Sequence, residues 1–102
     1  MPFITIYITY PDIETAKKIV EVLMEKRFIA CANFFPIESV YWWQGRIENA
    51  NEIVSLLKTR KENWDKIKEE VKKIHPYEVP CIEKFEVEAN EDYEKWIDKE
   101  TI

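Results

Sequence analysis

Alternating hydrophobic and polar positions predict four β-strands in this chain. The strands are expected over Phe3–Tyr10, Ala30–Trp43, Glu52–Lys58 and Cys81–Val87. Apolar or aromatic residues occupy both faces of the first strand, which is typical of a central strand. Pro36 falls within the second strand and cannot donate a backbone hydrogen bond. We therefore expect a β-bulge or a sheet edge at that position.

Hydrophobic residues spaced three and four apart predict helices between these strands. Asp12 can cap the first helix, whose apolar stripe is Ile13, Ala16, Ile19, Val20, Leu23 and Met24. Thr59–Glu62 has the spacing of a capping box for the second helix, and Pro76 ends that helix. The second apolar stripe is Trp64, Ile67, Val71 and Ile74. Asn90 is expected to cap a short last helix, which carries Tyr93, Trp96 and Ile97 on one side.

The order of these elements predicts an α+β fold. Gln44 and the only glycine, Gly45, lie between two strand-like runs, which indicates a tight hairpin turn with positive φ. The order is therefore β-α-β-β-α-β with one added helix, a split βαβ arrangement. A length of 102 residues leaves room for a single domain, residues 1–102.

Composition and charge exclude several classes of protein. The net charge is −5 and the basic residues are dispersed, so we expect no nucleic-acid partner. No apolar run approaches the roughly 20 residues that span a bilayer, so we expect no membrane partner. The first residues resemble no secretory leader, which favours the cytoplasm. Cys31 and Cys81 form no disulfide framework and no C-x-x-C motif, so both are expected to be thiols.

Three consecutive aromatic residues precede the hairpin turn. Alternation places Tyr41 and Trp43 on one face of the strand and Trp42 on the other. A small domain cannot readily bury aromatic rings on both faces of a hairpin end. We therefore predict a subunit contact or the wall of a cleft here, with an ordinary core position as the alternative.

Motifs along almost the whole chain occur together in a specific order. They are Thr9-Tyr10-Pro11-Asp12, Ala30-Cys31-Ala32-Asn33, Tyr41-Trp42-Trp43-Gln44-Gly45-Arg46, Leu57-Lys58-Thr59, His75-Pro76-Tyr77-Glu78-Val79-Pro80 and Tyr93-x-x-Trp96. In this combination the chain resembles the CutA family of divalent-ion-tolerance proteins. The resemblance implies a ferredoxin-like fold, with helices on one face of an antiparallel sheet and a short C-terminal helix. It also implies a homotrimer similar in design to the PII signalling proteins, and a link to tolerance of copper and other divalent ions.

The resemblance also suggests a metal ligand. His75 matches a proposed copper ligand of the family, whereas Ile8 and Ile74 stand where some members have cysteine and histidine. As the only histidine, His75 could instead bond a carbonyl at the end of its helix. Cys31 and Cys81 are soft donors suited to Cu(I), or else packed apolar side chains. A trimer would supply three copies of any one ligand.

The remaining polar candidates are assigned to a cleft by resemblance. Glu52, Lys58 and Tyr77 flank the motifs and are expected near a cleft between subunits. A single histidine and a single glycine leave little from which to build a catalytic site, so we expect no enzyme. We expect a homotrimer active in divalent-ion tolerance, through weak binding of Cu²⁺ or other divalent ions or through PII-like signalling, with no required cofactor. The alternatives are a small-molecule or anion sensor, or a structural trimer that binds another protein.

Overall fold

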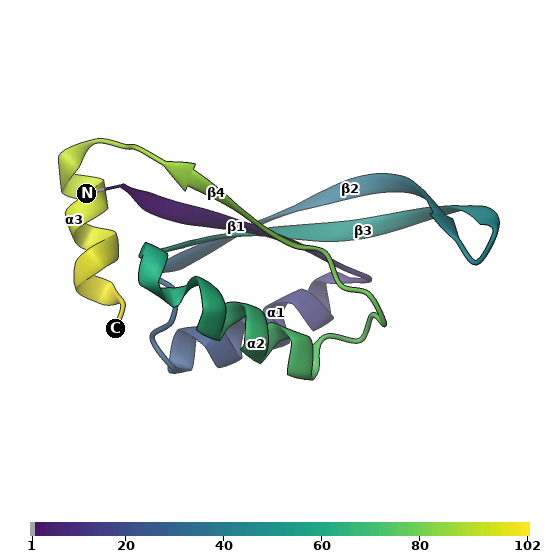
Figure 1. Cartoon of the computed structure of the whole chain (residues 1–102), viewed down its shortest axis with the longest axis horizontal. Helices are drawn as coiled ribbons and strands as arrows, with labels where there is room; N and C mark the ends of the chain where they lie inside the picture. Colours follow the sequence, from purple (N-terminus) through teal and green to yellow (C-terminus); the bar gives the residue numbers. More distant parts are fainter. Residues whose placement is uncertain (1) are drawn as a thin grey trace.

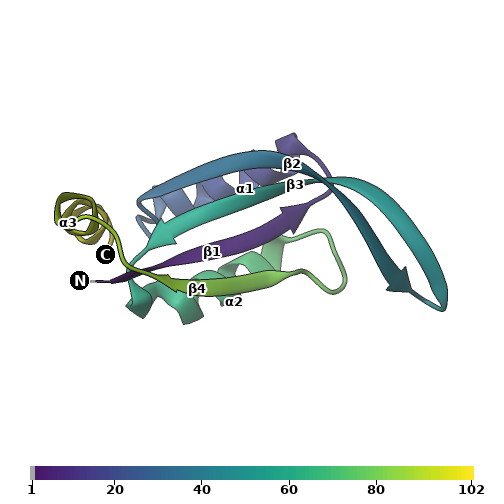
Figure 2. The same cartoon turned by 90° about the horizontal axis from the view of Figure 1, so that it is seen from above.

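A four-stranded antiparallel sheet forms the frame of the molecule. The structure is a computed structural model that describes residues 2–102, so Met1 of the predicted domain lies outside it. The strands are β1 (Phe3–Tyr10), β2 (Cys31–Trp43), β3 (Arg46–Thr59) and β4 (Ile82–Val87). They lie in the order β2-β3-β1-β4, as Figure 2 shows. The apolar first strand is therefore central, as predicted, and it is buried along nearly its whole length.

The helices lie on one face and at one end of this sheet. α1 (Ile13–Glu25) and α2 (Trp64–Ile74) cover the same face, and a short 3₁₀ turn, η1 (Lys61–Asn63), precedes α2 (Figure 1). α3 (Glu91–Glu100) lies at the end of the sheet near the N-terminus. The predicted α+β class, antiparallel sheet and helix layer are confirmed. No helix within residues 2–102 is long and apolar enough to cross a membrane.

The core lies between the sheet and the two covering helices. Alternate β1 residues face this layer, and the opposed Ile6 and Leu57 are both fully buried. The other buried members of the cluster are Ile4, Ile8, Tyr10, Ala16, Ile19, Val20, Leu23, Ile29, Ile67 and Val71. Tyr10 also places its hydroxyl 2.7 Å from Ser55 Oγ, so this buried polar group is paired.

The central hairpin is longer and more regular than the sequence pattern predicts. β2 pairs with β3 without interruption from Cys31 opposite Lys58 to Trp43 opposite Arg46, which excludes a β-bulge at Pro36. The edge alternative is confirmed, because β2 is the outermost strand and its proline needs no partner there. The turn residues Gln44 and Gly45 have φ of 50° and 80°, as the predicted tight turn requires.

The helix caps follow the sequence only in part. Asp12 caps α1 as predicted, because its Oδ1 accepts a hydrogen bond of 2.8 Å from the Thr15 amide. The capping box at Thr59–Glu62 is wrong, because the Thr59 hydroxyl donates instead to the Phe28 carbonyl, at 2.6 Å. Asn90 holds the N-cap position of α3 but makes no capping bond with its side chain.

Candidate functional site

His75 lies at the centre of a cluster where α2 ends, which we call the His75 cluster: Thr9, Tyr10, Glu52, His75 and Tyr77. Extended backbone at His75 ends the helix immediately before Pro76. The His75 Nε2 atom lies 2.8 Å from the Thr9 carbonyl oxygen. The Tyr77 backbone amide donates to His75 Nδ1, at 3.1 Å. A carbonyl only accepts and an amide N–H only donates, so these partners select the neutral ring with its proton on Nε2.

Tyr77 connects this cluster to the sheet. Its hydroxyl donates to Glu52 Oε2 at 2.6 Å, and Glu52 is buried although it carries a carboxylate. The His75 ring stacks on Tyr10, with ring centroids 5.4 Å apart, and its centroid lies 4.9 Å from that of Tyr77. Tyr10 belongs to the helix-covered face and Glu52 to the opposite face. The loop after α2 therefore passes around the end of β1.

The environment of the cluster shifts the pKa values of its ionisable groups. Burial lowers the pKa of His75 below its ordinary value, against a smaller opposing effect of the hydrogen bond to Thr9 and of the Glu52 charge. Burial raises the pKa of Tyr77, and the hydrogen bond to Glu52 raises it further. At neutral pH the cluster therefore holds an uncharged imidazole and an uncharged phenol.

The lowered pKa of His75 predicts a loss of stability in mild acid. The unfolded chain takes up a proton near pH 6.5, whereas the folded chain takes it up only at lower pH. The stabilisation is therefore complete above pH 6.5 and is lost as the pH falls through the folded-state pKa. Urea unfolding at steps between pH 7.5 and 5 is expected to show this decline, and a His75→Gln variant is expected to show a smaller one. An equal decline in both proteins would contradict the assignment.

The structure does not gather the three candidate metal ligands. Cys31 lies on the edge strand β2, with its Sγ 3.4 Å from the Tyr93 hydroxyl. Cys81 precedes β4 at the opposite edge and lies about four residues further along the strands, so the two cysteines are roughly 20 Å apart. Burial raises the pKa of Cys81, which favours the thiol over the metal-binding thiolate. Nowhere in residues 2–102 do three or more His, Cys, Asp or Glu side chains lie close enough to hold a metal ion.

His75 itself has no free nitrogen for a metal. Binding through Nε2 would displace its proton and leave the Thr9 carbonyl without this partner, while binding through Nδ1 would break the bond from Tyr77. A buried polar group left without its partner costs about 1–3 kcal/mol. The donor atoms of one chain therefore do not fit a resident divalent metal.

The three predicted cleft residues separate into two places. Glu52 and Tyr77 meet in the His75 cluster. Lys58 lies six residues from Glu52 along β3, roughly 20 Å away, and donates to Asn33 Oδ1 at 2.5 Å. Sequence reasoning missed the contributions of Thr9 and Tyr10, although both belong to the quoted Thr9-Tyr10-Pro11-Asp12 motif.

A shallow groove lies beside Glu52, at the point where the central hairpin leaves the sheet. Its volume is about 410 Å³, and its walls are Pro11, Asp12, Ile13, Pro36, Ile37, Glu38, Asn51, Glu52 and Ile53. The ionisable walls of this groove are all acidic. Such a groove suits a neutral or cationic group better than an anion.

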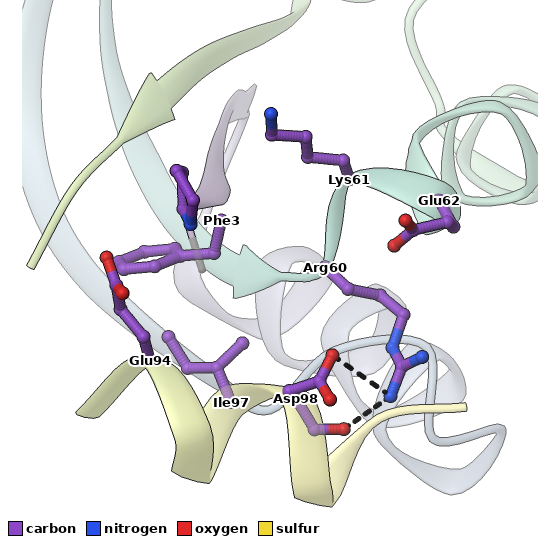
Figure 3. A pocket seen from close by; sticks show the side chains of 8 residues that line it. Phe3, Arg60, Lys61, Glu62, Glu94, Ile97 and Asp98 are labelled. Carbon is purple, nitrogen blue, oxygen red and sulfur yellow. Dashed lines mark hydrogen bonds and ion pairs between the residues drawn. The ribbon is translucent and has the colours of Figure 1, made fainter. Parts of the chain in front are cut away.

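A smaller pocket lies at the other end of the sheet, between the start of β1 and α3. Its volume is about 150 Å³ (Figure 3). Arg60 in its wall reaches the carboxylate of Asp98, at 3.4 Å, and also bonds the Asp98 backbone carbonyl. This guanidinium is thus already paired, and the predicted site residues lie elsewhere.

The aromatic hairpin extends beyond β1 and β4 (Figure 1). The register places Trp42 beside Ile47 on one face and Trp43 beside Arg46 on the other. The exposed fractions are 71% for Trp42, 43% for Tyr41 and 38% for Trp43. These rings therefore do not belong to the core of a single chain.

The sheet face opposite α1 and α2, here called the open face, is also apolar. Phe35 and Phe85 lie on it with exposed fractions of 39% and 51%. Tyr7, Val54 and Leu56 share this face. The hairpin and the open face together present large apolar side chains to water, a feature that is typical of association surfaces.

Known proteins match this chain along nearly its whole length. The family model described as CutA1 divalent ion tolerance protein matches residues 4–100. The divalent-cation tolerance protein CutA of Pyrococcus horikoshii is 46% identical over 99 residues, which is 96% of this chain and 97% of that protein. The solved structure of CutA1 from the same organism superimposes with a TM-score of 0.93, covering 97% of this chain and 98% of that one. CutA1 from Oryza sativa superimposes with a TM-score of 0.95 at 34% identity, covering 100% of this chain and 95% of that one. The chain therefore belongs to the CutA1 divalent ion tolerance protein family.

Proposed function

We propose that this chain acts in tolerance of divalent cations, copper among them, as a homotrimer that binds such ions weakly or has a PII-like signalling role. Its clefts between copies would receive a small ligand or a partner protein, and no reaction would be catalysed. The observation that best supports this proposal is the exposed aromatic hairpin, which lies beside the groove at Glu52. This arrangement provides both an association surface and a hollow that a neighbouring copy can deepen.

Assembly is supported by the apolar area that a single chain leaves in water. Each buried aromatic ring removes about 150–250 Å² from water. Trp42 on the hairpin and Phe35 and Phe85 on the open face are all exposed in one chain. Their burial between copies would supply the hydrophobic stabilisation that a chain of 102 residues obtains only in part from its own core.

Strong chelation of copper by each copy is not supported by the donor atoms. His75 has both ring nitrogens engaged, and Cys31 and Cys81 lie at opposite edges of the sheet. Weak binding at surface carboxylates remains available, because the chain has 20 acidic residues. A response to divalent ions through weak binding and a partner therefore fits these residues better than storage of the metal.

A small-molecule sensor is the second candidate, favoured by the groove itself. The acidic side chains Asp12, Glu38 and Glu52 line it together with apolar residues, so a neutral or cationic molecule fits better than an anion. Thermal melts with divalent metals, nucleotides and small amines separate these readings. A rise in melting temperature with amines that metals do not reproduce would favour the small-molecule sensor.

Cytoplasmic residence is part of the proposal. Both cysteines are free thiols, which suits a reducing compartment. The Archaeoglobus fulgidus relative is described as periplasmic and the Oryza sativa relative as chloroplastic. Fractionation of the source cells tests this point, with the chain expected among the cytoplasmic proteins.

Complementation tests the proposed function. A copper-sensitive bacterial strain that lacks its own family member is expected to regain growth in raised Cu²⁺ when it expresses this chain. A Phe35→Glu variant, expressed to the same level, is expected to fail because it places a charge on the open face. Absence of rescue by the unaltered chain would contradict the tolerance role, whereas full rescue by Phe35→Glu would contradict the need for assembly.

A further inference from the structure

We infer that His75 is a positioning residue and not a metal ligand: it clasps the loop after α2 to β1 and holds Tyr77 against Glu52. Divalent ions would then act on this protein without coordination by its only histidine. The inference goes beyond the proposed function, and it does not depend on how many copies assemble.

The first step, that His75 is not a metal ligand, follows from the hydrogen bonds of its imidazole. Nε2 lies 2.8 Å from the Thr9 carbonyl oxygen, and Nδ1 accepts the Tyr77 amide at 3.1 Å. A metal ion needs a nitrogen lone pair, and the only lone pair in the ring plane is the one that accepts from Tyr77. The ring is also held between Tyr10 and Tyr77 and is only 9% exposed. It therefore cannot turn toward solvent without leaving its two partners.

The second step, that His75 positions Tyr77, follows from the route of the loop after α2. Residues 76–81 leave α2, pass the end of β1 and enter β4 at Ile82. Two hydrogen bonds of Tyr77 tie this loop down, one from its amide to His75 and one from its hydroxyl to Glu52. His75 accepts the first bond and so holds the Tyr77 backbone in place. The position of that backbone allows the Tyr77 hydroxyl to reach Glu52. Glu52 also lines the groove, so the clasp fixes one wall of that groove.

A histidine-specific label tests the first step directly. His75 is the only histidine, so protein labelled with ¹⁵N-histidine reports on this ring alone. Long-range ¹H–¹⁵N spectra at pH 7.5 are expected to show a neutral ring protonated on Nε2. Addition of Zn²⁺, a diamagnetic divalent probe, is expected to leave both ring nitrogen shifts unchanged. A shift of either nitrogen on addition of Zn²⁺, or the opposite tautomer, would overturn the inference.

Substitutions at His75, with Tyr77→Phe as a reference, test both steps. Calorimetric titration with Cu²⁺ is expected to give the same Kd for the unaltered chain and for His75→Ala, within about twofold. A larger weakening in His75→Ala would restore the ligand role. The high-pH ultraviolet titration of Tyr77, identified as the component missing in Tyr77→Phe, is expected to move toward ordinary tyrosine in His75→Ala and to be largely retained in His75→Gln. No movement in His75→Ala would rule out positioning. Should His75→Ala fail to fold, the labelled spectra of the unaltered chain still decide the metal question.

Discussion

Replacing Leu57 with alanine is expected to lower the free energy of unfolding by about 2–5 kcal/mol. Leu57 is fully buried and pairs with the fully buried Ile6 in the layer between the sheet and the helices. The substitution removes three carbon atoms from the centre of the core. The two covering helices cannot close the resulting cavity without losing their own contacts with the sheet. Equilibrium urea unfolding measures the change.

Met24 provides the control for this substitution. It lies on α1 with an exposed fraction of 44%, so Met24→Ala is expected to change the free energy of unfolding by only about 0.5 kcal/mol. Both variants are compared at the same chain concentration, because the stability of an assembled protein depends on it. Equal losses in the two variants would contradict the central position of Leu57 in the core.

Replacing Phe35 with glutamate is expected to separate the proposed assembly into folded single chains. Phe35 lies on the open face opposite Val54 and is 39% exposed, so one chain can accommodate a carboxylate there in contact with water. Burying that charge between copies would cost several kcal/mol. Sedimentation velocity is expected to show the mass falling to that of the 12.3 kDa chain, with the circular dichroism of the fold retained.

A charge of the same kind on the helix layer is the matched control. Met24→Glu introduces a glutamate at a position of similar exposure on α1, which lies across the sheet from the open face. Its mass in solution is expected to equal that of the unaltered chain. Dissociation by Met24→Glu, or none by Phe35→Glu, would place the association surface elsewhere.

The fold could be predicted because its signals are local and repeated. The apolar stripes of Ile19 and Leu23 and of Ile67 and Val71 mark two helices, and all four residues are buried against the sheet. Of the two alternatives predicted at Pro36, the sheet edge is confirmed and the bulge is wrong, because a missing amide is tolerated wherever a strand has no outer neighbour. Whether a strand has an outer neighbour depends on the strand order, which is set by contacts between segments distant in the sequence.

The capping box failed for a related reason. Thr59 has the sequence spacing of a cap, but a carbonyl from a distant segment, that of Phe28, accepts its hydroxyl. The Asn63 side-chain amide donates to the same carbonyl, at 2.8 Å, so two polar groups near the start of the second helix are committed to tertiary contacts. Spacing along a chain cannot reveal such a competitor.

The sequence identifies most residues of the candidate site, but it does not predict how they contact one another. His75, Glu52 and Tyr77 all come from the sequence, and the structure places them together. Lys58 was grouped with them by motif and lies far along the same strand. The two partners of the His75 ring are backbone groups, a carbonyl of β1 at Nε2 and the Tyr77 amide at Nδ1, and such groups carry no sequence signature because nearly every residue has them.

Light scattering of the purified chain at micromolar concentration measures whether three copies assemble in solution. A homotrimer is expected to give a particle of about 37 kDa, three times the 12.3 kDa chain. Such a mass would mean that copies cover the aromatic hairpins and open faces that one chain leaves in water. A stable particle of 12.3 kDa would contradict the association surface and, with it, the proposed clefts between copies.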